Sequence, residues 1–195
     1  MLTLTGRMSA RSPLTAEALD AYGEDDHVEL IDGELVIETM TSFEHGDAQM
    51  SLGGTLKRYF GGNGPPGGGG GWWLASEVDV EYANTQVLRH DLSGWRKSRV
   101  PARPAGKRMT TPPDWVCEIL STNRNRDLVD KRRILHSHSV PHYWLVDLEE
   151  PLLTVLRYHP DGYLIVATAR PGERSQLEPF ADVELEVTGL FGDPG

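Results

Sequence analysis

The sequence predicts a single α/β domain in which helices cover a mixed β-sheet. The chain has 195 residues, a usual length for one domain that buries its own core. Short apolar runs typical of strands alternate with longer segments of helical periodicity. Their order is helix, three strands, helix, strand and a closing hairpin, and this order favours a sheet with helices packed on it.

The first elements are marked by local signals. A short helix is expected over residues 13–19, where Thr15 is in a position to cap it. Two β-prone runs flank an Asp-Gly pair, which is a strong hairpin signal, so residues 28–37 are expected to form an N-terminal hairpin. Apolar residues recur at spacings of three and four over residues 43–60, which predicts a helix.

Three segments lack the pattern of a packed element. Residues 1–12 are polar and are expected to be flexible. Residues 61–71 are almost entirely glycine and proline, so we expect a loop there. Residues 98–113 contain four prolines together with several basic residues, which indicates a connecting loop.

The remaining segments predict the core of the sheet. Residues 77–82 alternate between apolar and polar side chains, and residues 87–92 form a second strand. The run at 115–120 is apolar except for one acid, which is typical of a buried central strand. A helix, a further strand and a closing antiparallel pair are expected over 125–138, 143–147, 152–158 and 163–168.

Composition and charge restrict the class of protein. The formal net charge is −10, so contact with a polyanion requires a local basic patch or bound cations rather than an overall basic domain. The one cysteine, Cys117, has no partner for an internal disulfide, which fits a reducing compartment. No apolar run has the length of a signal peptide or a membrane span, and a cytoplasmic location is therefore expected.

Two acidic residues interrupt apolar strands of the predicted sheet. Glu118 lies in the run at 115–120, and Asp91 lies in the strand at 87–92. An unpaired carboxylate is costly to bury, so each needs a partner, a metal ion or the open end of its strand. If the two strands are neighbours, the carboxylates can converge, and the backbone carbonyl of Ile119 can add a further oxygen. Such oxygens suit Mg²⁺, which also binds substrate phosphate.

Lys131 lies on the predicted helix that follows the Glu118 strand. From there its ammonium group can reach back over the strand ends and orient an attacking water or stabilise charge on a phosphate. The residues alone do not distinguish these catalytic roles from purely structural ones. Each acid fits equally well as the partner of a backbone group or an arginine at the end of its strand, and most lysines lie on a solvated face.

Several strings of this sequence resemble the Uma-two family of bacterial restriction-endonuclease-like proteins. The resemblance extends from about Thr15 to Phe191. Its strongest parts are PDWVCEILST at 113–122, then Asp127 and Lys131, then HYWLVD at 142–147, and HDLSGWRKSRVP at 90–101. The ELIDGE hairpin at 29–34, His45 and the glycine-rich loop before Trp72 also match family positions.

The resemblance implies a fold and a set of metal ligands. The family belongs to the PD-(D/E)XK superfamily, which implies a restriction-endonuclease-like mixed sheet with a core of αβββαβ type. It also implies that Asp91 and Glu118 hold Mg²⁺ or Mn²⁺. The lysine expected two positions after the glutamate is absent, because Leu120 stands there, and Lys131 is the position that matches its role. The residue before Asp91 is His90 where the motif usually has proline, and this leaves the carboxylate in place.

The resemblance further implies accessory residues and partners. Glu34 and His45 would lie near the site as accessory catalytic residues, and Glu77 is a further candidate metal ligand. Nucleic acid, with DNA expected, would be the substrate. A second copy of the chain would be the partner in a homodimer.

Three functions stay open at this point. The first is a metal-dependent endonuclease that hydrolyses phosphodiester bonds. The second is a catalytically silent module that keeps the nuclease fold and binds nucleic acid or regulates another protein. The acidic net charge keeps it open, whereas the complete set of two acids and a lysine favours the first. The third is a sugar- or nucleotide-processing hydrolase with the same metal pair, which no residue supports directly. Trp72, Trp73 and Trp95 lie beside loops and are candidates for a dimer contact or a substrate-facing edge.

Overall fold

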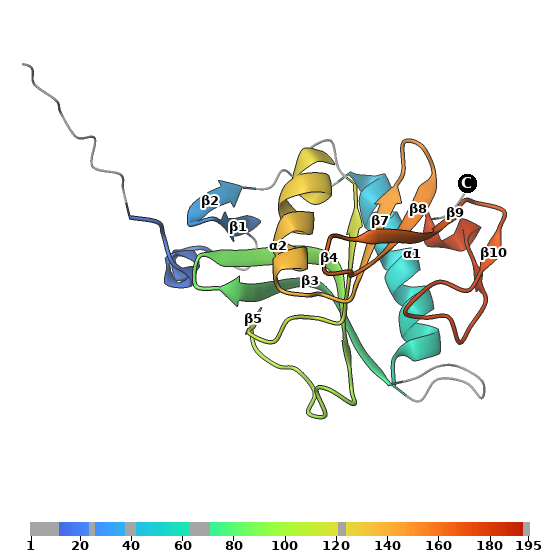
Figure 1. Ribbon diagram of the computed structural model, residues 1–195, viewed down its shortest axis with the longest axis horizontal. Helices are drawn as coiled ribbons and strands as arrows, with labels where there is room; N and C mark the ends of the chain where they lie inside the picture. Colours follow the sequence, from blue (N-terminus) through green and yellow to red (C-terminus); the bar gives the residue numbers. More distant parts are fainter. Residues whose placement is uncertain (1–11, 24–25, 38–41, 63–70, 121–123, 193–195) are drawn as a thin grey trace, which may run out of the picture.

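A mixed nine-stranded sheet forms the centre of the molecule (Figure 1). The computed structural model describes residues 12–23, 26–37, 42–62, 71–120 and 124–192. The strands follow the order β2-β1-β4-β6-β7-β8-β9, and β3 pairs with both β4 and β5 off this path. The pairs β6–β7 and β3–β5 are parallel, and the other pairs in this sheet are antiparallel. The predicted mixed α/β fold is therefore confirmed.

The elements of the first part of the chain are a short helix, a hairpin, a long helix, a second hairpin and a short strand. They are η1 (Ala16–Ala21), β1 (Val28–Ile31), β2 (Glu34–Ile37), α1 (Phe43–Phe60), β3 (Trp72–Ala83), β4 (Gln86–Arg96) and β5 (Arg108–Met109). The later elements are β6 (Trp115–Ile119), η2 (Arg126–Lys131), α2 (Arg132–Ser137), β7 (His142–Asp147), β8 (Leu152–Arg157), β9 (Leu164–Ala169), β10 (Arg174–Ser175), β11 (Leu185–Glu186) and η3 (Thr188–Leu190). Among the described helices, none is long and apolar enough to cross a membrane.

The local signals in the first third of the chain have clear structural causes. Asp32 and Gly33 both have positive φ, at 51° and 79°, as a two-residue hairpin turn of the favoured twist requires. Helix α1 begins after Ser42, whose side chain accepts a 3.3 Å hydrogen bond from the backbone N–H of His45. Both the hairpin and the helix have the bounds that the sequence predicts. Met50, part of the predicted apolar pattern of α1, is instead 72% exposed.

The sheet has two apolar faces, because side chains on a strand alternate. One face packs against α1 and the C-terminal segment, with a core that contains Leu52, Trp115 and Trp144. The other face packs against α2, with a core that contains Val116 and Ile134. Strand β6 is buried on both sides, as the sequence predicts for a central strand.

Some expectations needed correction. The side chain of Thr15 makes no capping bond, because its hydroxyl donates to Glu17 at 2.7 Å instead. Strands β3 and β4 extend well beyond the predicted 77–82 and 87–92, since they pair along a long hairpin. The helix expected over 125–138 begins as the π-helical η2 and continues as α2. Residues 1–11 of the segment expected to be flexible and residues 63–70 of the expected glycine-rich loop lie outside the described residues.

A break in the sheet beside β4 positions the candidate site. Strand β3 pairs with β4 along almost its whole length, so it occupies one edge of β4. Strands β1 and β6 must therefore share the other edge. Strand β1 pairs with β4 at Val87, and β6 pairs with it from Leu92 to Gly94. Between these points, the backbone of β4 faces neither strand and is contacted by side chains.

Candidate functional site

The backbone of Arg89, in the break between β1 and β6, is bonded by two charged side chains. Its N–H donates to Glu29 Oε1 at 2.8 Å, and its carbonyl accepts from Lys131 Nζ at 3.0 Å. Buried backbone groups need such partners where a neighbouring strand is missing. Glu29 comes from β1 and Lys131 from the end of η2, so the break joins the N-terminal hairpin to the helix that follows β6.

Lys131 and Glu118 form an ion pair inside the protein. Lys131 Nζ lies 3.2 Å from Glu118 Oε2, and both residues are 2% exposed. The same ammonium lies 3.3 Å from Glu29 Oε1 and 3.7 Å from Asp127 Oδ1. Among the described residues of this cluster, three carboxylates thus surround one lysine. The structure brings Lys131 to Glu118, although 13 residues separate them in the chain.

The second oxygen of Glu118 is held by a histidine. His90 Nδ1 lies 2.5 Å from Glu118 Oε1, and the hydroxyl of Tyr82 lies 2.8 Å from His90 Nε2. Burial raises the pKa of the Tyr82 hydroxyl well above its ordinary value, so this phenol keeps its proton and donates it to Nε2. Nδ1 then carries the imidazole proton and donates to Glu118. Burial and the nearby Lys131 hold the pKa of His90 well below its ordinary value, so the ring is neutral.

The pKa of Glu118 is raised well above the ordinary value of a glutamate. Burial is the main cause. Lys131 opposes the effect, whereas the negative charges of Asp91, Asp127 and Glu29 add to it. Added positive charge beside Glu118 would favour its ionised form.

Asp91 lies on β4, next to the point where the pairing between β4 and β6 ends. Its Oδ2 accepts a 2.6 Å hydrogen bond from the backbone N–H of Ile119, the residue after Glu118. Its Oδ1 lies 3.0 Å from His45 Nε2, on the buried face of α1. Burial lowers the pKa of His45, but the hydrogen bond and charge of Asp91 outweigh it, and the pKa is raised overall. The structure therefore brings the predicted residues Asp91 and His45 together.

Gln49 joins Glu77 to this group. Its side-chain amide donates to Glu77 Oε1 at 2.6 Å and to the backbone carbonyl of Asp91 at 2.8 Å. The pKa of Glu77 is raised, first by desolvation of its carboxyl group and then by the charge of Asp91, against the lowering effect of Gln49. Glu77 also has φ 53°, a left-handed conformation that is uncommon for a residue other than glycine.

Both strands of the β3–β4 hairpin change face at Glu77 and Asp91. Leu88 packs in the core under α2, whereas Leu92 packs in the core under α1. Residues four apart on a regular strand would share a face. The register pairs Ser76 with Leu92 and Val78 with His90, without a pair between Glu77 and Asp91. His90 points to Glu118 and Asp91 points to α1, as neighbours on a strand do, whereas the irregularity places Leu92 on the α1 side together with Asp91.

The structure thus arranges the predicted residues in two adjacent groups and leaves one apart. Asp91, His45 and Glu77 form the group beside α1, and Glu118 and Lys131 form the group under η2. The Ile119 peptide connects them, because its N–H binds Asp91.

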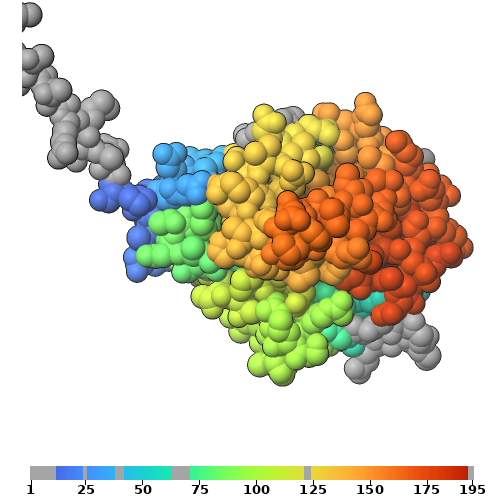
Figure 2. Space-filling view, viewed as in Figure 1, coloured from blue at the N-terminus to red at the C-terminus, as the bar shows by residue number. Residues whose placement is uncertain are grey.

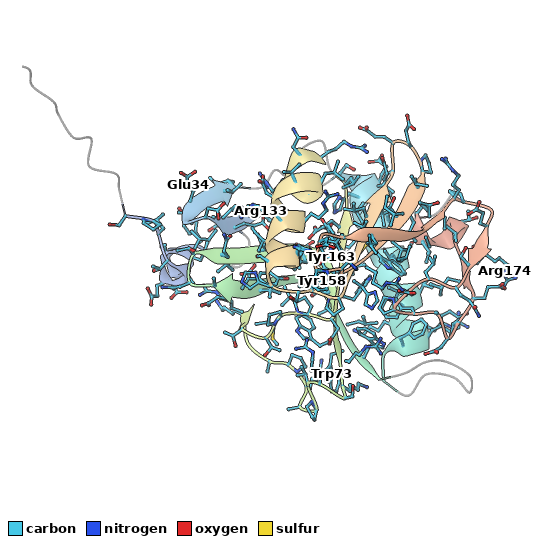
Figure 3. All side chains as sticks on the ribbon, in the orientation of Figure 1. Glu34, Trp73, Arg133, Tyr158, Tyr163 and Arg174 are labelled. Atoms are coloured by element: carbon cyan, nitrogen blue, oxygen red, sulfur yellow. The ribbon has the colours of Figure 1, made fainter. Side chains whose placement is uncertain are left out.

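Glu34 is not brought into either group. It is exposed on β2, where it lines a different hollow with Arg126 and Asp130. Figure 3 shows it at the outer edge of the N-terminal hairpin.

Five residues of the site are not singled out by the sequence as site residues. They are Glu29, Gln49, Tyr82, His90 and Asp127. Weak signals exist for some of them. Glu29, His90 and Asp127 belong to the strings that carry the family resemblance, and Gln49 lies one helical turn after His45, on the same side of α1. Nothing in the sequence distinguishes Tyr82 from an ordinary apolar position of a strand.

The fit of a divalent cation depends on the carboxylates. Within the described ranges, no three His, Cys, Asp or Glu side chains are grouped as metal ligands, and Asp91 and Glu118 each contact hydrogen-bond donors through both oxygens. Mg²⁺ needs only one or two protein carboxylates, because waters and substrate phosphate complete its shell. The carboxylate oxygens of Asp91 and Glu118 are of the donor type that such a cation prefers.

Comparison with known proteins agrees with this architecture. Residues 15–188 match the model of the Uma2 family, which is described as "Putative restriction endonuclease". Among solved structures, the chain is similar to a protein from Anabaena variabilis that is described as a putative nuclease belonging to DUF820. That similarity has a TM-score of 0.67 at 20% identity and covers 92% of this chain and 98% of the other, so it shows a shared fold. Comparison with curated proteins gives no match. Since the family model spans most of the sequence, this chain belongs to the Uma2 family.

Proposed function

We propose that this protein is a nuclease that uses a divalent cation, Mg²⁺ or Mn²⁺, to hydrolyse phosphodiester bonds in DNA. One observation carries the proposal. Asp91 is bonded to the peptide that follows Glu118, and Glu118 is paired with Lys131, so two acids from neighbouring strands and one lysine lie at one break in the sheet. Membership of the Uma2 family, which is described as "Putative restriction endonuclease", supports the same activity.

Asp91 and Glu118 would hold the cation, and the backbone carbonyl of Ile119 and the carboxylate of Glu77 are further candidate ligands. A divalent cation at this place would lower the pKa of a water molecule and neutralise charge on the phosphate. Lys131 would add a fixed positive charge close to the reacting phosphate. Its bonds to Glu118 and Arg89 hold the ammonium in one position without solvent exposure.

The histidines have distinct roles in this proposal. His90, fixed by Tyr82, holds Glu118 in one orientation and stays neutral, so it acts as a positioning residue. His45 contacts Asp91 and has a raised pKa. It would hold a proton on its ring beside Asp91, where a leaving oxygen of the cleaved strand needs one.

A second candidate function has specific support. Both oxygens of Asp91 and of Glu118 already contact donors, and Glu118 is 2% exposed. A protein that had lost catalysis but kept the fold would tolerate buried carboxylates whose oxygens already contact hydrogen-bond donors. In that case the chain would be a nucleic-acid-binding or regulatory module without nuclease activity.

A cleavage assay separates the two candidates. Single- and double-stranded DNA and RNA are incubated with the full chain and Mn²⁺ or Mg²⁺, and cleavage is followed on denaturing gels. Cleavage by the native protein that is lost in Asp91→Asn and Glu118→Gln supports the nuclease. The exposed acid Asp161 provides a matched control, and Asp161→Asn should cleave like the native chain. No metal-dependent cleavage of any substrate, or equal cleavage by all variants, would sink the proposal.

The accessory residue is tested in the same cleavage assay, and the oligomer is tested by a separate measurement of mass. Glu34 is proposed as an accessory acid despite its exposed position on β2. Full activity of Glu34→Gln would remove it from the site. The proposed homodimer is tested by light scattering after gel filtration, where a mass of one chain, 21.6 kDa, at assay concentrations would contradict it.

A further inference from the structure

A strongly basic segment follows β4 in this otherwise acidic chain. Residues 96–113 contain no acidic residue, although the formal net charge of the whole protein is −10. Their basic residues are Arg96, Lys97, Arg99, Arg103, Lys107 and Arg108. In Figure 2 the yellow-green surface to which this segment belongs stands out below the rest of the molecule. A concentration of positive charge on one loop attracts a polyanion even when the net charge is negative.

A cavity of about 360 Å³ lies between this segment and strand β3. Its walls combine aromatic and apolar side chains with two cations, among them Trp73, Val78, Trp95, Met109, Lys57 and Arg103. Such a mixture suits a flat, apolar group that is attached to an anion. A nucleobase with its phosphate has this chemistry.

Trp73 is held in a fixed orientation at the wall of the cavity. Its indole N–H donates a 2.9 Å hydrogen bond to the carbonyl of Val100 in the basic segment. Lys97 Nζ lies over the indole ring, 4.4 Å from its centroid. Trp73 lines the cavity and is only partly buried, so part of its ring can contact a group bound there. Figure 3 shows Trp73 beside the loops on this side of the molecule.

The cavity leads toward the proposed active site. A neighbouring groove along α1 shares Lys57, Leu74 and Ala75 with it and reaches Gln49. Gln49 bonds both Glu77 and the backbone of Asp91. Trp73 and Glu77 lie on the same strand, four residues apart, which corresponds to about 13 Å of extended chain. One nucleic-acid strand could therefore occupy both places at the same time.

We propose that this cavity binds one unpaired nucleobase of a single-stranded nucleic acid, stacked on Trp73, while Lys57 and Arg103, the two cations that line it, bind the adjoining phosphates. The proposal rests on the proposed nuclease function and specifies its substrate: a single strand, or a duplex that is locally opened. DNA and RNA share this chemistry, and the experiment distinguishes them. Stacking on an aromatic side chain does not depend on which base is present, so little sequence preference is expected.

Binding is measured on the full chain in EDTA, so that no cleavage occurs. Fluorescence anisotropy with labelled DNA and RNA strands of about 12 nucleotides, and with the matching duplexes, gives the dissociation constants. Tighter binding of one of the single strands than of its duplex is expected. Trp73→Ala should weaken single-strand binding about tenfold, and Trp73→Phe, which keeps an aromatic face, should bind nearly as the native chain does. Tyr158→Ala, a change at a half-buried aromatic residue that Figure 3 shows apart from Trp73, should have no effect.

An abasic strand separates stacking from a structural role of Trp73. It keeps the phosphates and lacks the bases, so native and Trp73→Ala protein should bind it equally. A loss of the same size on abasic and normal strands would overturn the proposal, as would native affinity of Trp73→Ala for normal strands. Arg103→Ala should lower the salt dependence of binding by about 0.7 in logarithmic slope, whereas Arg170→Ala should not.

The outcome is independent of catalysis. The binding assay contains no metal, so it does not depend on whether the chain cleaves its substrate. If no substrate is cleaved but binding depends on Trp73 as described, the nuclease function fails and the binding site stands. If cleavage occurs and binding does not depend on Trp73, the nuclease function stands and the binding site fails.

Discussion

The backbone N–H of Ile119 donates a 2.6 Å hydrogen bond to Asp91 Oδ2, across the break where β4 and β6 separate. The ladder between these strands ends at the pair of Leu92 and Cys117. Beyond it, a side-chain oxygen takes the place of a backbone acceptor, so Asp91 both completes the sheet and brings its charge beside Glu118. A substitution of Asp91 should therefore affect the position of the Glu118 strand as well as local charge.

Asp91→Asn should lower the pKa of His45. In the native chain, burial lowers this pKa, but the hydrogen bond and the negative charge of Asp91 raise it above 6.5 overall. Removing the charge leaves the effect of burial dominant. NMR titration of the imidazole signals measures the change. His142, whose pKa is lowered to about 4 by burial, serves as an internal control and should not move. An unchanged titration of His45 would contradict the assigned pair.

The same shift predicts how stability depends on pH. The pKa of His45 is higher in the folded state than in the unfolded chain, so the folded state binds the proton more tightly. The stability that His45 contributes is fully present below about pH 6.5 and is lost as pH rises through the folded pKa. His45→Gln should therefore cost more stability in acid than in alkali. Urea unfolding of both proteins on each side of this range tests it, and a cost that grows with pH would refute it.

Lys131→Met should destabilise the protein by roughly 3–5 kcal/mol, because it leaves buried carboxylates without the ammonium at their centre. Lys131 lies within 4 Å of Glu29, Glu118 and Asp127 and is 2% exposed. Urea unfolding at neutral pH measures the loss. Arg132→Met changes the next residue, which is exposed, and should cost less than about 0.5 kcal/mol. Equal effects of the two changes would show that the buried ion pairs contribute nothing.

Divalent cations should stabilise the native chain through Asp91 and Glu118. A ligand that binds only the folded state adds about 2.7 kcal/mol at a concentration one hundred times its Kd. Thermal unfolding with increasing Mn²⁺ or Mg²⁺ should therefore show a rising Tm for the native chain and for Asp161→Asn. Asp91→Asn and Glu118→Gln should lose the rise. A rise of the same size in all four proteins would place the cation elsewhere.

Gly94→Ala should destabilise the hairpin of β3 and β4 by about 1–3 kcal/mol, as overpacking of a core commonly does. A Cβ at this position would lie 2.9 Å from Leu74 Cδ2 and 3.2 Å from the rings of Trp72 and Trp115. Gly54→Ala is the control, because a Cβ on this residue of α1 meets nothing within 4 Å and a helix favours alanine. Urea unfolding compares the two, and a stable Gly94→Ala protein would show that the Trp72 and Trp115 rings can move.

The sequence alone determines the elements whose signals are local. The Asp32-Gly33 turn and the helix over 43–60 have the predicted bounds, because turn geometry and helical periodicity depend on neighbouring residues. The sequence left open whether the strands of Asp91 and Glu118 are neighbours, and the structure pairs them as β4 and β6. Their proposed catalytic role remains a prediction.

Only the tertiary structure decides which groups meet at the site. Glu29 reaches the backbone of Arg89 across 60 residues, and Gln49 reaches Asp91 across 42. These contacts exist because β1 and β6 share one edge of β4 and leave a break, a property of the pairing order rather than of any local pattern. Asp91 and Leu92 both lie on the α1 side because the hairpin changes face there, and no periodicity in the sequence marks that point.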